Sequence, residues 1–167
     1  MKKGRMIFIS VILGIVIYYI WSQPISYDRA YAFPEGFRGC AYIVYHVEDA
    51  PPLEIKHFTI LYEFDEDGIL LTSSPEDFGW EGKKHSGWYK SEFYYVDENG
   101  KKVQDIPQDM IGFHALGSYE KEGETMLTRE TFSVGDPDVL CDTNYDDLLK
   151  KLEKRNIKVG KAKSKEE

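Results

Sequence analysis

The sequence predicts a mainly β protein: a single antiparallel β-sandwich of about seven strands, followed by one C-terminal amphipathic helix and preceded by an N-terminal transmembrane helix. Three observations favour this class. Aromatic residues make up 14% of the chain, and together with Thr and Val they fit the pleated surface of a sheet. Short alternating runs recur between Gly, Pro, Asn and Asp turn signals. The 167 residues suffice for one core of ordinary size, so we expect one folded domain.

An apolar segment opens the chain. Lys2, Lys3 and Arg5 precede it, and no charged residue occurs from 6 to 27. A helix needs about 20 residues to cross the hydrocarbon layer of a bilayer, so residues 1–27 are predicted to form a membrane anchor. Basic residues ahead of such a segment keep its start in the cytoplasm, which places the following domain outside the cell membrane.

A cleaved leader is the alternative interpretation of this segment. Ala30-Tyr31-Ala32 has the small-x-small form that a signal peptidase accepts, and cleavage near Ala32 would secrete the domain. However, this site lies eleven residues beyond Trp21, and Tyr18, Tyr19 and Trp21 occupy the positions of an interfacial aromatic belt. We therefore expect a retained single-pass anchor, and secretion stays the alternative.

Residues 28–37 are predicted to be a linker and residues 38–157 the folded domain. Seven runs in this domain have the composition of strands and are bounded by turn residues. They are 40–47, 57–64, 69–72, 88–96, 101–106, 113–119 and 126–134. The clearest is 57–64, where four apolar residues alternate with three others and place a mainly apolar set on one face.

The period of the apolar residues changes near the C-terminus. Tyr145, Leu148, Leu149 and Leu152 follow the spacing of an amphipathic helix, which we expect to pack on the sheet. Residues 158–167 are rich in Lys and poor in apolar side chains, so they are predicted to be a disordered basic tail.

Charge is distributed unevenly along the chain. The net charge is -8, whereas residues 22–149 alone carry 26 acidic and 10 basic side chains. This balance disfavours nucleic acid as a partner, because a phosphate backbone is bound by clustered Lys and Arg. It is compatible with cations or basic partners, and equally with a solvated face that keeps an exported protein soluble.

Cys40 and Cys141 are the only cysteines. An exported domain meets oxidising conditions, in which the two residues would form a disulfide from the first predicted strand to the start of the helix. Two buried free thiols fit the sequence as well, because spacing along the chain does not show whether the two Cα atoms come close.

No motif for catalysis, metal binding or cofactor binding is recognisable. The sequence contains neither Gly-x-Ser-x-Gly nor His-Glu-x-x-His, and its four histidines stand singly: His46, His57, His85 and His114. Asp65-Glu66-Asp67-Gly68 has part of a calcium loop but lacks the third ligand and the distant Glu. We therefore predict no catalytic residue, no metal and no cofactor.

One aromatic group is the candidate for ligand binding. Phe78, Trp80, Trp88 and Tyr89 flank a Gly-rich loop that also carries Lys83, Lys84 and His85. Exposed aromatic rings beside polar groups suit the recognition of sugars or peptides. In the alternative arrangement, Trp80 and Trp88 fill the core at one end of the sandwich.

Four segments carry a resemblance to a known family. They are Phe33-Pro-Glu-Gly-Phe-Arg-Gly39, Asp49-Ala-Pro-Pro-Leu53, Asp67-Gly-Ile-Leu-Leu-Thr-Ser-Ser74 and Phe93-Tyr-Tyr-Val-Asp97. In this order they resemble a family of small exported domains of Gram-positive bacteria, whose function is unknown. The resemblance covers residues 33–135 and implies a membrane- or envelope-associated β domain. It implies no catalytic or binding residue.

These observations predict a non-enzymatic binding module of the cell envelope. The N-terminal helix would hold it at the membrane, and loops at one end of the sandwich would bind another envelope protein or a wall polymer. The alternative from a different class is a hydrolase that acts on cell-wall glycan through carboxylates.

Overall fold

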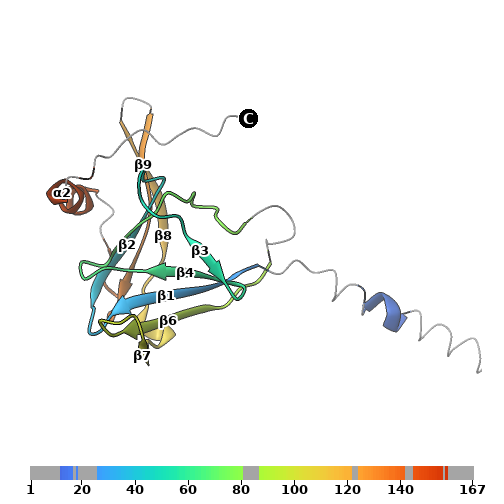
Figure 1. Cartoon of the computed structure of the whole chain (residues 1–167). Coiled ribbons are helices and arrows are strands. Elements are labelled where there is room, and N and C mark those ends of the chain that lie inside the picture. The colour runs from blue at the N-terminus through green and yellow to red at the C-terminus, as the bar shows by residue number, and fades with distance from the viewer. Residues whose placement is uncertain are drawn as a thin grey trace, which may run out of the picture.

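The computed structural model describes residues 12–16, 18, 26–80, 87–121, 124–141, 145–155 and 157. Its elements form three layers, namely a five-stranded sheet, a four-stranded sheet and one helix (Figure 1). The strands are β1 (Asp28–Pro34), β2 (Gly39–Tyr45), β3 (Glu54–Lys56), β4 (Thr59–Glu63), β5 (Ile69–Leu71), β6 (Ser91–Val96), β7 (Lys102–Asp105), β8 (Ala115–Lys121) and β9 (Glu124–Val134). A 3-10 helix, η2, spans Gln108–Met110, and helix α2 spans Asp146–Lys154.

The five-stranded sheet has the order β3-β4-β1-β6-β7 and is centred on β1. Strand β1 runs parallel to both β4 and β6, and Tyr31 pairs with Tyr62 on one side and with Phe93 on the other. The three rings stack with centroids 4.8 and 4.5 Å apart. Alternation along β1 sends Tyr31 and Phe33 into the space between the sheets, where they form the middle of the main core.

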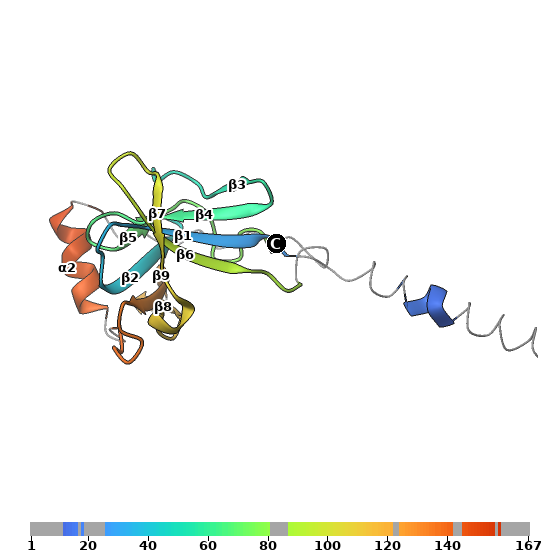
Figure 2. The same ribbon diagram turned by 90° about the horizontal axis from the view of Figure 1, so that it is seen from below.

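The four-stranded sheet, ordered β5-β2-β9-β8, is covered on both faces. One face of β2 packs against the five-stranded sheet, and the other face packs against α2 (Figure 2). Leu148 and Leu152 of α2 are fully buried against Tyr42 and Val44 of β2. Each buried Leu side chain stabilises the fold by about 2 kcal/mol, so this apolar stripe holds the helix on the sheet.

The mainly β class is confirmed, but two details of the predicted sandwich are wrong. The described residues form nine strands rather than about seven, and both sheets are mixed rather than antiparallel. The additional strands are β1, which lies in the predicted linker 28–37, and β3. Alternation reveals a strand but not its partner, so the parallel pairs β1·β4, β1·β6 and β2·β5 could not be foreseen.

The predicted transmembrane helix is not found among the described residues. Residues 12–16 and 18 are helical, but in the described part of the chain no helix has both the length and the apolar character for a membrane span. The rest of the segment 1–25 lies outside the described residues, as does the predicted tail 158–167.

A disulfide joins Cys40 in β2 to Cys141 in the segment before α2. The two Cα atoms lie 5.4 Å apart, within the range that a disulfide spans without backbone movement. The bond closes a loop of 101 residues that contains most of both sheets. In the chain-entropy model, a loop of this length stabilises the folded state by about 4.7 kcal/mol.

Candidate functional site

A cleft of about 700 Å³ opens where β1, β4 and β6 end. These three strands are parallel, so their carboxyl ends meet at one edge of the sheet, and the arrowheads in Figure 1 point the same way. The cleft is lined by the residues that end each strand or directly follow it. Five of them carry carboxylates: Glu35, Asp65, Glu66, Asp97 and Glu98.

The turn after β4 forms one rim of the cleft. Asp65 Oδ1 accepts hydrogen bonds from the backbone N–H groups of Asp67 and Ile69, both at 3.0 Å. Gly68 completes the turn at a φ of 71°, and a Cβ on this residue would lie 2.2 Å from the Phe37 ring. Only glycine fits both the backbone angle and the contact, so this rim has a defined shape.

The turn after β6 forms a second rim in the same way. Asp97 Oδ1 accepts hydrogen bonds from the N–H groups of Asn99 and Lys101, both at 2.9 Å, and Gly100 has a φ of 73°. Both carboxylates are therefore used partly to close their own turns, which is the usual role of Asp in an Asx turn. The two similar turns face each other across the cleft because β4 and β6 flank β1.

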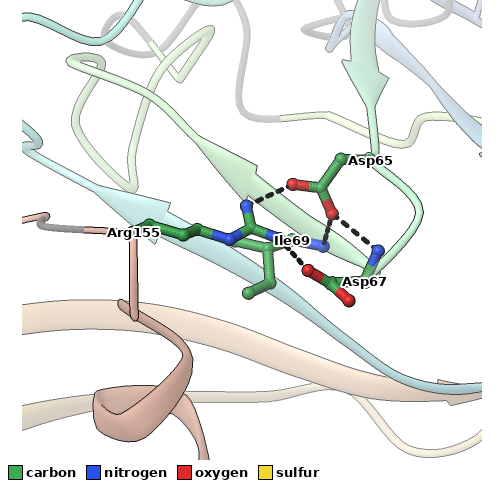
Figure 3. Close-up of polar contacts among 4 residues, drawn as sticks. All are labelled: Asp65, Asp67, Ile69 and Arg155. Carbon is green, nitrogen blue, oxygen red and sulfur yellow. Dashed lines mark hydrogen bonds and ion pairs between the residues drawn. The ribbon is translucent and has the colours of Figure 1, made fainter. Parts of the chain in front are cut away.

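Arg155 ties the first rim to the C-terminal end of helix α2 (Figure 3). Its guanidinium donates to Asp65 Oδ2 at 2.5 Å and, through its other terminal nitrogen, to the carboxylate of Asp67. These bonds raise the pKa of Arg155 above its ordinary value, and the bond to Asp65 has the larger effect. The two carboxylates that suggested part of a calcium loop thus hold an arginine, and no group of three or more metal-ligating side chains occurs among the described residues.

The opposite end of the sheet carries the amino ends of the same three strands. The N–H of Asp28 donates to the carbonyl of Phe58 at 3.1 Å, and the N–H of Arg29 donates to the carbonyl of Lys90 at 2.8 Å. Asp28 Oδ1 in turn accepts the N–H of Lys90 at 2.8 Å. These bonds bring the segments before β1, β4 and β6 together at one edge.

Four aromatic side chains are exposed at this edge, and we call them the aromatic end. They are Phe58 at 44% exposed, Trp80 at 48%, Trp88 at 94% and Tyr89 at 39%. Gly79, next to Trp80, packs against Ile60 and Tyr27 beside the start of β1. Trp80 and Trp88 therefore do not fill the core, whereas Phe78 packs against it. Lys83, Lys84 and His85 lie outside the described residues.

A strained turn holds Phe58 at the aromatic end. His57 and Phe58 form the two-residue connection between β3 and β4, and their φ angles are 50° and 66°. Such a turn normally takes Asn-Gly, because other residues pay roughly 1–2 kcal/mol for left-handed backbone. The Phe58 ring lies 4.8 Å from the Tyr27 ring.

Arg29 connects the aromatic end to a polar cluster between the sheets. Its guanidinium lies 4.4 Å from the centre of the Tyr89 ring, and its Nε is buried with no hydrogen-bond partner. Deeper in the core, the carboxylate of Glu130 accepts hydrogen bonds from the Tyr45 hydroxyl at 3.0 Å and from His114 Nδ1 at 2.7 Å. Burial raises the pKa of Tyr45, so its phenol stays protonated and continues to donate.

The pKa of Glu130 is lowered although its burial acts in the opposite direction. The hydrogen bond and charge of His114, the Tyr45 hydroxyl and the charge of Arg29 together outweigh desolvation. Sequence reasoning missed this cluster because His114 and Glu130 meet only across the β8–β9 hairpin. The sequence did contain one signal for this cluster. Glu130 lies two and four residues before the buried Phe132 and Val134 in β9, so its side chain is on the same buried face of the strand.

Fold and site together define a small two-sheet domain that is acidic at one end and aromatic at the other. The chain belongs to a family of unknown function (DUF6843), whose match covers residues 26–144 and hence all nine described strands. The fold is similar to the crystal structure of a "Putative Lipoprotein from Bacillus anthracis", with a TM-score of 0.59 and 19% identity over 77% of this chain and 93% of that chain. No curated protein matches the sequence.

Proposed function

We propose that this protein is a non-enzymatic binding module of the cell envelope, in which the acidic cleft binds a positively charged segment of another envelope protein. The observation that carries the proposal is the convergence of three loops and five carboxylates around one cleft of about 700 Å³. Loops held by a rigid sheet are the usual place for binding residues. The sequence predicts either another envelope protein or a wall polymer as the partner. An anionic wall polymer would be repelled by these carboxylates, which favours the protein partner.

The charge of the cleft is only partly neutralised by the protein itself. Arg155 bonds Asp65 and Asp67 on one rim. Glu35, Glu66 and Glu98 are exposed, and no cation of the described residues pairs with them. They are free to meet lysine or arginine side chains of a partner, which favours fast, salt-dependent association.

A binding measurement with matched variants tests this proposal. The probe is a fluorescent oligolysine peptide, titrated with the purified protein at low and moderate salt. We expect Glu35→Gln, Glu66→Gln and Glu98→Gln together to weaken binding by about tenfold, because each surface charge pair contributes roughly 0.5 kcal/mol. The control variant removes three exposed carboxylates elsewhere, at Glu48, Asp109 and Glu153. Equal losses in both variants would mean that the peptide responds to net charge alone and would contradict a cleft-specific site.

The glycan hydrolase that the sequence left open would use the same cleft, because glycosidases act through paired carboxylates. Release of sugar from purified cell walls measures this activity. Activity that is lost on replacing single cleft carboxylates by Ala would favour the enzyme over the binding module. If the protein releases no sugar but still binds oligolysine, the result supports the binding module.

The location of the domain is part of the proposal: the apolar segment before residue 26 tethers it to the outer face of the cell membrane. Retention of this segment is supported by the position of Ala30-Tyr31-Ala32 in the central strand β1. Tyr31 is 2% exposed, and cleavage after Ala32 would remove most of β1 from the sheet. A tag after Glu167 should be removed by protease on intact protoplasts; a tag that is cut only in lysates would place the domain inside the cell.

A further inference from the structure

We propose that the aromatic end of the domain lies in the interface of the bilayer that holds the N-terminal segment. This inference rests on the tether of the proposed function but concerns a different surface from the cleft. Trp88 is almost fully exposed, and Trp80, Phe58 and Tyr89 are each exposed by more than a third. Trp and Tyr are the side chains that prefer the headgroup level of a membrane, where a ring meets both apolar and polar surroundings.

The path of the chain brings this surface to the membrane. Seven peptide steps separate Trp21, the last residue of the apolar run, from Asp28 at the start of β1. Even fully extended, these steps span about 25 Å. The amino end of β1 is therefore close to the membrane, and the backbone bonds of Asp28 and Arg29 place Phe58 and Lys90 at that same edge.

In the proposed orientation, the acidic end of the five-stranded sheet faces away from the membrane. The acidic cleft lies at the carboxyl end of β1, and a strand of seven residues has a length of about 23 Å. Anionic lipids repel the cleft and leave the aromatic end as the surface that approaches them. Lys90 is exposed and directly follows Tyr89.

The strained turn at His57 and Phe58 also indicates that the aromatic end of the sheet has a function. Two residues with side chains adopt left-handed backbone there, and the turn presents the Phe58 ring to solvent beside Tyr27. An exposed apolar ring at a strained turn contributes little to the stability of an isolated domain. Insertion into a membrane interface gives that ring an apolar environment.

Tryptophan fluorescence of the full chain in vesicles tests the inference. The protein is reconstituted into phosphatidylglycerol–phosphatidylethanolamine vesicles that contain a lipid with a nitroxide on its headgroup. One variant keeps only Trp88, through Trp21→Phe and Trp80→Phe, and a second keeps only Trp80. The control keeps none of the three tryptophans and carries Leu140→Trp instead. Leu140 is 89% exposed and neighbours Cys141, whose disulfide partner Cys40 lies near the carboxyl end of β1.

We expect the nitroxide to quench Trp88 and Trp80 several-fold more strongly than Trp at position 140. Equal quenching at all three positions, or none at Trp88 and Trp80 in protein that floats with the vesicles, would overturn the inference while leaving the tether intact. Protein that does not float with the vesicles would overturn the inference together with the tether. Oligolysine binding in the cleft is measured separately on the protein without vesicles, because the peptide also binds anionic lipids.

Discussion

Arg155 and Asp65 lie 90 residues apart in the sequence and are joined by an ion pair of 2.5 Å. This contact connects the residue after helix α2 with the turn that forms one rim of the acidic cleft. The end of helix α2 therefore contributes to the shape of the site, and the helix also covers the four-stranded sheet.

Replacing this arginine should loosen the rim. Arg155→Ala leaves Asp65 and Asp67 as neighbouring like charges, so we expect a loss of about 1 kcal/mol in the free energy of unfolding, with a smaller loss at high salt. Urea denaturation at two salt concentrations measures both effects. Lys154→Ala is the control, because Lys154 is exposed in the last turn of the same helix. Identical losses in the two variants would show that the ion pair is not responsible.

Stability should fall in acid through Glu130. Its pKa in the folded state is below the usual 4.5, so the ionised carboxylate stabilises the fold at neutral pH, and this contribution is lost as the pH falls through the lowered pKa. Glu130→Gln should cost about 1–3 kcal/mol at pH 7, because Tyr45 and His114 lose a charged acceptor. The difference from wild type should shrink below pH 4 in urea titrations. A difference that stays constant between pH 7 and pH 3 would contradict this role.

Reduction should destabilise the folded domain. Opening the bond between Cys40 and Cys141 releases a loop of 101 residues and should lower the free energy of unfolding by about 4.7 kcal/mol. Urea unfolding with and without reductant gives the difference. The Cys40→Ser, Cys141→Ser variant should be as unstable as the reduced protein and should not respond to reductant. Alkylation of both cysteines in unreduced, unfolded protein would rule the bond out.

Two similar glycines should differ in their tolerance of a methyl group. Gly68 and Gly100 have nearly the same positive φ, but a Cβ at Gly68 meets the Phe37 ring whereas a Cβ at Gly100 meets nothing within 4 Å. Gly100→Ala should cost only the backbone strain, about 1 kcal/mol. Gly68→Ala should cost a further 1–3 kcal/mol or so, because the ring has to move. Equal losses of stability in the two variants would mean that the Phe37 ring moves aside without a measurable cost.

If the domain is tethered as proposed, the mature protein should keep β1. Mass spectrometry of protein isolated from membranes should show that residues 26–34 are present. Cleavage after Ala32 is expected only in protein that fails to fold, since Tyr31 and Phe33 form the middle of the core. A stable mature protein that begins at Phe33 would contradict the topology described for the five-stranded sheet.

Local patterns in the sequence were sufficient to locate seven strands and the helix. The runs around Ile60, Tyr62 and Phe64, and around Leu148 and Leu152, carry their own periodicity, and the structure buries these residues as the patterns predict. Strand β3 gave no such pattern, because all three of its residues are exposed. The sequence predicts a linker in place of β1 because small alanines and Pro34 interrupt its aromatic residues.

The candidate site depends on information that no local pattern contains. Asp65-Glu66-Asp67-Gly68 and Asp97-Glu98-Asn99-Gly100 are both recognisable as turns, but only the parallel pairing with β1 brings them to one cleft. The aromatic group was predicted from its composition, and the sequence did not decide between exposed and core tryptophans. His114 and Glu130 show the same limit, because a pair between the residue before β8 and a residue of β9 has no signature in either segment alone.

The central position of β1 has a consequence for how the protein is made. If the domain lies outside the membrane as proposed, β1 is the first strand to leave a translocation channel. It then has no neighbour until β4 and β6 follow, and β6 ends at Val96. The central strand would then stay without its partners until more than half of the chain has crossed. Long-range parallel pairing of this kind is slow to form, so a chain exported in this way would depend on protection from proteases and aggregation during that interval.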